Sequence, residues 1–338
     1  MNDYWKDRAL QRELESQLIA DKHIARMDGR LREAQQNINR EIESFYARYS
    51  VENKVTMTEA RKYLNAKEMK DFKDMDLKKF RTLALANNPA YEQLLNSISS
   101  RVRISRLEIL HAQIQVQLLD MYGGSRGFQG AVYSGLSEVY ESSYYQMMFD
   151  MAKVGVAAGT IVTAISGDVM KEVLSYNWSG KEFSKRIWDH QAGAIDSVRK
   201  ELERSFAGGR SLRDTTKAIM EKTNVSRSKV ENLVRTESNF FHGLAAQNSY
   251  RDAELEKYEI LSTLDGRTSD TCRYQDGKIY NVKDYNPGVN ANPFHARCRT
   301  TTIPWFDESE YLDGEKRQSA DGLIDSMTYE QWFSKYVI

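Results

Sequence analysis

Apolar residues recur at helical spacing through the first part of the chain. In the clearest stripe Ile24, Leu31, Ile38 and Phe45 recur every seven residues, with Met27 and Ala34 between them. This spacing places the side chains on one face of a helix, with polar residues around the rest. The pattern predicts a long amphipathic helix whose apolar stripe packs against a partner helix.

A second stripe predicts another helix over residues 104–121. Its members alternate gaps of three and four residues: Ile104, Leu107, His111, Ile114, Leu118 and Met121. Only Pro89 precedes Pro287, so proline hardly interrupts this part of the chain. We therefore expect residues 1–122 to form a helical hairpin or bundle that binds a partner. We interpret His111 as a core histidine, because it lies on this apolar stripe.

Glycines mark the first expected boundary. The run YGGSRGFQG over residues 122–130 relaxes the backbone and predicts a loop or hinge. The apolar stretch Val154–Ile165 that follows is rich in Gly and Ala and too short to span a bilayer. We predict a buried helix or strand there and no membrane anchor. Residues 123–177 are thus assigned to a hinge and a small-residue apolar segment.

Helical spacing returns over residues 178–252. Gly208 and Gly209 are expected to end one helix, Ser211 to cap the next and Ser226 to start a third. The stretch carries an excess of basic residues, which indicates a solvated helical face or contact with an acidic partner.

A small sheet is predicted in the last third of the chain. Two short runs with strand character, Tyr258–Leu264 and Lys278–Val282, are accompanied by Asp-Gly turn signals, and TTTIPWF supplies a third candidate. The fold class is therefore mainly α, a helical bundle of long amphipathic helices with a small C-terminal α+β module. So small a sheet has little core of its own, and a staple between its loops would stabilise it.

The two cysteines of the chain are candidates for that staple. Cys272, His295 and Cys298 offer three of the four ligands that zinc prefers, with an acid such as Asp270 or Asp276, or water, as the fourth. Two reduced, buried thiols packed together are an equal alternative to a metal site. A Cys272–Cys298 disulfide is a third alternative if the protein leaves the reducing cytoplasm.

Charge and length narrow the functional classes. The 338 residues carry 48 basic and 48 acidic side chains, so the formal net charge is zero. This balance disfavours a broad basic surface for non-specific nucleic-acid binding. The charged N-terminal sequence MNDYWKDRALQRELESQL lacks the regions of a signal peptide, and we expect synthesis in a cytoplasm.

Three motifs in this order carry a resemblance to a known family: LVRTESNFFHGLAAQNSY, LDGRTSDTCRYQDGKIY and NPFHARCRTTTIPW. They resemble the phage Mu F-type minor head proteins, also called phage head morphogenesis proteins. The upstream stretches WSGKEFSKRIW and AGGRSLRD are similar to longer members of the family. The resemblance covers residues 178–306, which we treat as one Mu F-like module, and the ordered succession is more specific than any single motif.

The resemblance implies a non-enzymatic component of a tailed bacteriophage. A member would be a minor protein of the procapsid and virion, made in the cytoplasm of the host bacterium and present in few copies in the head interior or at the portal vertex. It would act in head assembly or DNA delivery. The expected partner is the phage portal protein, with scaffold protein, major capsid protein and phage DNA as further candidates.

The family motif also implies which residues shape the module. The matching positions are Arg235, Thr236 and Glu237 in the helix, Asp265, Arg267, Thr268 and Cys272 in the hairpin, and His295, Cys298 and Arg299 in a terminal clasp. Many members have a second cysteine three residues after the first, whereas this chain has Gln275. The resemblance therefore does not complete a four-ligand zinc set, and we expect no cofactor, with zinc as the alternative.

Two other functions stay open from the sequence. One is a DNA-binding ejection protein, and the other is a zinc-dependent hydrolase using Cys272, His295 and Cys298. Arg235, Glu237 and His242 are instead expected to be structural, since charged pairs are frequent on helices. Residues 307–338 form an acidic tail in which Tyr329, Trp332, Phe333 and Tyr336 predict a short aromatic helix.

Overall fold

A computed structural model describes residues 2–52, 106–156, 160–207, 210–305 and 329–337. The chain divides into two compact units, and each unit draws on separated stretches of sequence. The first contains residues 1–24, 132–183 and 231–338, and the second contains residues 25–131 and 184–230. The four segments expected from proline and glycine usage remain a prediction about domain organisation.

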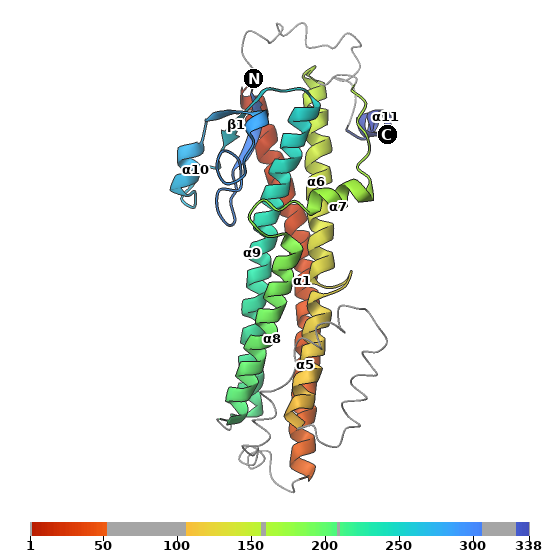
Figure 1. The fold of residues 1–338 in the computed structure, drawn as a ribbon, viewed down its shortest axis with the longest axis vertical. Helices are drawn as coiled ribbons and strands as arrows, with labels where there is room; N and C mark the ends of the chain where they lie inside the picture. The colour runs from red at the N-terminus through yellow and green to blue at the C-terminus, as the bar shows by residue number, and fades with distance from the viewer. Residues whose placement is uncertain (1, 53–105, 157–159, 208–209, 306–328, 338) are drawn as a thin grey trace. The chain divides into compact units, whose positions relative to one another are not determined.

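The described residues are mostly helical, and the predicted fold class is confirmed (Figure 1). The helices are α1 (Asn2–Glu52), α5 (Arg106–Tyr122), α6 (Phe128–Lys153), α7 (Gly167–Leu174), α8 (Phe183–Ala207), α9 (Leu212–Asp252), α10 (Asp270–Gln275) and α11 (Tyr329–Tyr336). The strands are β1 (Lys257–Leu261), β2 (Ile279–Asn281) and β3 (Thr301–Trp305), and a 3₁₀ turn, η2, spans Val282–Asp284.

The second unit is a bundle of helical segments from α1, α5, α8 and the start of α9. All six apolar residues of the predicted N-terminal stripe are buried, so the stripe packs inside the chain. Polar contacts flank the packing: Arg30 Nη2 lies 2.7 Å from Asp120 Oδ2, and Gln35 Nε2 donates to Thr223 Oγ1 over 2.8 Å. The prediction of a helix that needs a partner is confirmed, with the partner helices supplied by the same chain.

Helix α5 confirms the second predicted stripe where the structure describes it. His111, Ile114, Leu118 and Met121 are all buried, whereas Ile104 lies outside the described residues. Burial lowers the pKa of His111 to about 4, with Arg199 contributing, so the ring is neutral at pH 7. This agrees with a core histidine.

The first unit is held by a buried ion pair between α1 and α6. Arg12 and Asp150 are almost completely buried, and the Arg12 guanidinium donates to the Asp150 carboxylate. Arg8 adds a bond of 2.9 Å from Nε to the same carboxylate. Because a buried charge is costly unless it is paired, this contact fixes how the two helices meet.

Helix α6 was not predicted, since residues 123–177 were assigned to a hinge and a small-residue segment. Most of its length is buried on several sides, including Val132, Leu136, Val139, Met147 and Met151. A helix that is buried nearly all round shows no clear apolar stripe, and stripe spacing was the signal used. The glycine run before it forms the turn between α5 and α6.

The described residues of the stretch 154–165, namely 154–156 and 160–165, do not form the buried helix or strand that was predicted. The described part has no regular element, and Ile161 is 64% exposed. Val162 is buried and its N–H donates to the Tyr336 carbonyl at the end of α11 over 2.7 Å. Within the described ranges, no helix combines the length and apolarity needed to cross a bilayer.

Helix α9 runs without a break through Ser226, so the third helix expected to start there is wrong. The Ser226 hydroxyl donates to the Lys222 carbonyl of the preceding turn, which lets serine sit inside a helix. The predicted cap at Ser211 is confirmed, because its Oγ accepts from the Asp214 N–H over 2.9 Å. The short aromatic helix predicted near the C-terminus is also present as α11, where Phe333 packs edge-on against Tyr145.

The C-terminal sheet has the strand order β2-β1-β3, and both pairings are antiparallel. Tyr258 in β1 faces Tyr280 in β2 and Pro304 in β3. Figure 1 shows the sheet beside the end of α9, with α10 on its outer side. All three strands were predicted, but the connection between the first two contains α10 rather than a simple hairpin turn.

We expect Asp150→Ala to destabilise the protein strongly, because it leaves Arg12 buried without its counter-charge. Breaking such a pair typically costs about 3–5 kcal/mol of unfolding free energy. Asp120→Ala removes an ion pair in which Asp120 is 70% exposed, and it should cost less than about 1 kcal/mol. Urea unfolding measures the unfolding free energy of each variant. Equal losses of unfolding free energy in the two variants would contradict the role given to the buried pair.

Candidate functional site

Three potential metal-ligand residues meet beside the sheet. Cys272 lies on α10, whose first turn is capped by Ser269: the Cys272 N–H donates to Ser269 Oγ over 3.2 Å. His295 and Cys298 lie in the loop before β3, where the Cys298 N–H donates to the His295 carbonyl over 3.2 Å. Cys272 was expected on a hairpin, and the structure corrects this to a short helix.

The spacing of the three side chains suits a metal ion. Cys272 Sγ lies 3.7 Å from Cys298 Sγ and 3.1 Å from His295 Nε2, and all three atoms lie within 4.8 Å of one another. The sulfur atoms are too far apart for a disulfide, whose S–S bond is about 2.05 Å. Two sulfurs bound tetrahedrally to zinc at about 2.3 Å lie about 3.8 Å apart, close to the observed separation.

Hydrogen bonds set the protonation of the cluster. His295 Nδ1 lies 2.8 Å from the Ala296 carbonyl oxygen, which can only accept, so Nδ1 carries a proton, and the other ring nitrogen, Nε2, lies 3.1 Å from Cys272 Sγ. Metal-binding histidines commonly use their second nitrogen in this way. A hydrogen bond from the Cys298 thiol lowers the pKa of Cys272 to about 4, and the same hydrogen bond raises the pKa of Cys298.

The chain supplies no fourth ligand among its described residues. Gln275 is engaged elsewhere, since its Nε2 donates to the Val289 carbonyl and its Oε1 accepts from Tyr280. Asp276 accepts from the Ser262 N–H, and no carboxylate of the described ranges joins the cluster. A cavity of about 20 Å³ adjoins Cys272 and His295, enough for one water molecule.

A second group of motif residues organises the loop before α10. Asp265 accepts two bonds from Arg299, of 2.8 and 2.6 Å, and one of 2.8 Å from the Arg267 N–H. The Arg299 contact holds the pKa of Asp265 well below its usual range. Thr268 donates to the Thr263 carbonyl and accepts from the Asp265 N–H. The Arg267 side chain is 81% exposed.

The helix motif Arg235, Thr236, Glu237 makes contacts in two directions. Arg235 pairs with Asp21 of α1 at 2.8 Å and with Glu231 one turn earlier at 3.0 Å. Glu237 is buried and accepts from Trp178 Nε1 over 3.0 Å. Thr236 donates to the Asn232 carbonyl and accepts from the Arg297 N–H, which ties α9 to the loop that carries His295 and Cys298.

Sequence reasoning missed a set of amides that join α9 to the same loop. Asn292 Nδ2 donates to the backbone carbonyl of Asn239, and Asn239 Nδ2 donates to the Thr300 carbonyl, both buried. Gly243 permits this contact, since a Cβ there would lie 2.7 Å from Asn292 Nδ2. No spacing rule relates residues more than fifty positions apart, so the sequence offered no signal for this network.

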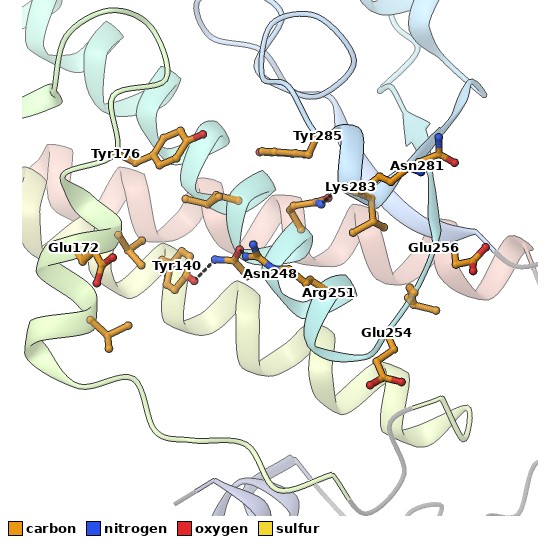
Figure 2. Close-up of a pocket in the computed structure, with 16 residues that line it drawn as sticks. Tyr140, Glu172, Tyr176, Asn248, Arg251, Glu254, Glu256, Asn281, Lys283 and Tyr285 are labelled. Carbon is orange, nitrogen blue, oxygen red and sulfur yellow. Dashed lines mark hydrogen bonds between the residues drawn. The ribbon is translucent and has the colours of Figure 1, made fainter.

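A large pocket was also missed. It has a volume of about 900 Å³ and is lined by residues of α6, α7, the end of α9 and the stretch after β2 (Figure 2). Tyr140, Tyr176 and Tyr285 contribute aromatic surface, and Asn248 Nδ2 donates to the Tyr140 hydroxyl over 2.6 Å. The lining residues come from four separate stretches of sequence, each unremarkable when read alone.

Comparison with known proteins tests the resemblance drawn from the motifs. Residues 196–303 match the family model described as Phage Mu protein F like protein, and they include all the motif residues discussed above. This part of the chain is similar to the phage Mu F-like family. The match supports a phage head morphogenesis protein, as the three motifs implied.

A relative of different description is also similar to the chain. The NAD(+)–arginine ADP-ribosyltransferase EFV of Enterococcus faecalis (strain ATCC 700802 / V583) is 22% identical over 263 residues, which cover 70% of this chain and 51% of the relative. The chain therefore spans about half the length of that protein. No solved structure matches the chain significantly.

We expect His242 to make the protein less stable in acid. The ring is buried between Ser143 of α6 and Thr301 of β3, and burial lowers its pKa to about 3, with Arg12 contributing. The unfolded chain binds a proton near pH 6.5, so stability is complete above that pH and falls on acidification towards pH 3, by up to about 1.4 kcal/mol per pH unit.

The measurement is urea unfolding of the protein and of His242→Gln between pH 7.5 and pH 5. The variant should be less stable at pH 7.5 and should lose less on acidification. Identical pH dependence in the two proteins would show that His242 does not titrate as described. His111 is present in both proteins, so its contribution cancels in the comparison.

Proposed function

We propose that this protein is a non-enzymatic minor head protein of a tailed bacteriophage. It sits in the head interior at the portal vertex, binds the portal protein and acts in procapsid assembly or DNA delivery. The family match over residues 196–303 is the observation that carries the proposal. The contacts of the motif residues support it, because Arg235, Thr236 and Glu237 all hold elements of the fold together.

The chemistry of the thiol cluster favours a structural role over hydrolysis. A hydrolase needs room for a substrate beside its nucleophile, and the cavity next to Cys272 and His295, of about 20 Å³, holds only one water molecule. His295 Nδ1 bonds to the Ala296 carbonyl, and no carboxylate of the described residues orients the ring. The transferase named in the comparison is about twice as long as the matched region. The match to half of that protein therefore does not by itself assign transferase activity to this chain.

An exposed row of leucines on α1 is the surface we assign to the portal contact. Leu10, Leu14 and Leu18 are 43%, 57% and 67% exposed and follow one another at intervals of one helical turn. The N-terminal stripe first considered for this role is buried within the chain. Large apolar side chains gathered on one exposed helix face are typical of protein-binding surfaces.

The test is incorporation of the triple variant Leu10→Ser, Leu14→Ser, Leu18→Ser into procapsids of the phage that encodes the protein. We expect incorporation and portal binding to fall by about tenfold or more, since each lost apolar contact weakens binding by roughly 1 kcal/mol or more. Circular dichroism should show an intact fold because the three positions are exposed.

Leu264→Ser and Val225→Ser are the matched controls, since both side chains are exposed and neither belongs to α1. They should be incorporated normally. Full portal binding by the triple variant would exclude this surface. Absence of the wild-type protein from procapsids and virions would exclude the proposed function itself.

We further propose that Cys272, His295 and Cys298 bind one zinc ion as a structural clasp, with water in the fourth position. The Sγ–Sγ distance and the protonated Nδ1 of His295 support this. Zinc would link α10 to the loop before β3 and so stabilise the small sheet.

Elemental analysis and thermal unfolding test the clasp. We expect about one zinc per chain, and removal by a chelator should lower the melting temperature. His295→Ala and Cys298→Ser should lose the metal, whereas the control His190→Ala should keep it. A protein that takes up no zinc, with unchanged melting in the presence of chelator, would show that the thiols act without metal.

A further inference from the structure

We infer that the large pocket beside α7 binds a short peptide segment of a protein partner, one with an apolar side chain next to lysine or arginine. The inference deepens the proposed function, on which it rests for the partner being a protein. All lining residues belong to the first compact unit. At about 900 Å³ the pocket is as large as known ligand sites.

Apolar surface is available on one wall of the pocket. Val169 of α7 is 47% exposed and Tyr176 just after α7 is 49% exposed, with Val173 and Leu255 also lining the space. Figure 2 shows Tyr176 on the α7 side of the pocket and Tyr285 on the opposite side. An aliphatic or aromatic side chain entering between them would remove this surface from water.

Two tyrosine hydroxyls in the pocket call for a hydrogen-bond acceptor. The Tyr140 hydroxyl accepts from Asn248, and no described residue accepts its proton. The Tyr285 hydroxyl is buried and has no hydrogen-bond partner among the described residues. Gln247 is already committed to the Val282 carbonyl. A backbone carbonyl of an extended peptide is an acceptor for the Tyr140 proton, and it would reach the enclosed Tyr285 hydroxyl only if that side chain turned towards the pocket.

The charged side chains around the pocket favour a ligand with a positive charge. Three carboxylates, Glu172, Glu254 and Glu256, line it against two cations, Arg251 and Lys283, a formal balance of 2 − 3 = −1. None of the three carboxylates pairs with a described cation, whereas Arg251 donates to Asn248 Oδ1. This arrangement opposes phosphate-bearing ligands and favours a basic residue, which can also lie over a tyrosine ring.

The experiment uses the full-length chain and fluorescently labelled nine-residue peptides. Each peptide has a central leucine or phenylalanine flanked by lysines, by serines or by glutamates, and labelled ADP-ribose serves as a phosphate-bearing probe. We expect the lysine-flanked peptides to bind about tenfold or more tightly than the glutamate-flanked ones. ADP-ribose should not bind.

Pocket variants should weaken the lysine-flanked peptides. We expect about fivefold to tenfold loss for Tyr176→Ala and for Val169→Ser, of which the second leaves the stacking of Tyr176 on Phe240 in place. The double variant Glu254→Lys, Glu256→Lys should reverse the charge preference. Tyr274→Ala and Glu221→Lys, exposed positions outside the pocket, should bind as the wild type does.

The inference would be overturned if the wild type bound none of the peptides, or bound lysine-, serine- and glutamate-flanked peptides equally well. It would also be overturned if Tyr176→Ala and Val169→Ser both bound the lysine-flanked peptides as tightly as the wild type, or if the wild type bound ADP-ribose and Val169→Ser abolished that binding. A wild-type protein that enters procapsids yet binds no peptide would overturn the pocket inference alone. One that binds the lysine-flanked peptides but is absent from procapsids would overturn the proposed function alone.

Discussion

The C-terminal sheet depends on hydrogen bonds from the polar face of α9. A sheet of three strands, of which one has three residues, buries too little apolar surface to stand alone. His242 reaches Thr301, Asn239 reaches the Thr300 carbonyl, and Gln247 reaches the Val282 carbonyl. Two of these bonds reach the start of β3, and the third reaches the 3₁₀ turn after β2. The helix therefore acts as the template on which the module is arranged.

This dependence explains why the family motif alternates between helix and loop. The Thr236 hydroxyl of α9 accepts a hydrogen bond from the Arg297 N–H. The loop around Arg297 carries His295 and Cys298. The placement of the thiol cluster thus follows from the helix contact, whether or not a metal is bound. These side chains hold the backbone of the module in place, which agrees with the structural role proposed for the protein.

The two surfaces assigned here differ in chemistry. The leucine row on α1 is a simple apolar face, whereas the pocket beside α7 combines aromatic walls, tyrosine hydroxyls and carboxylates that pair with no cation of the described residues. The buried pair of Arg12 and Asp150 lies on the helices that carry these surfaces, α1 and α6. A rigid ion pair between two helices keeps each exposed face in a fixed orientation within the unit.

The sequence by itself determined the local elements. Helical spacing placed α1, α5 and the end of α9, and strand and turn signals placed β1, β2 and β3, because these patterns are set by residues a few positions apart. Spacing did not reveal α6, which is buried nearly all round and lacks a stripe. Only the tertiary structure brought Asn292 to Asn239, Cys272 to Cys298, and Tyr176 to the pocket with Tyr285. Those contacts join residues from 26 to 109 positions apart (298 − 272 = 26 and 285 − 176 = 109), and packing, rather than any local pattern, selects which of them meet.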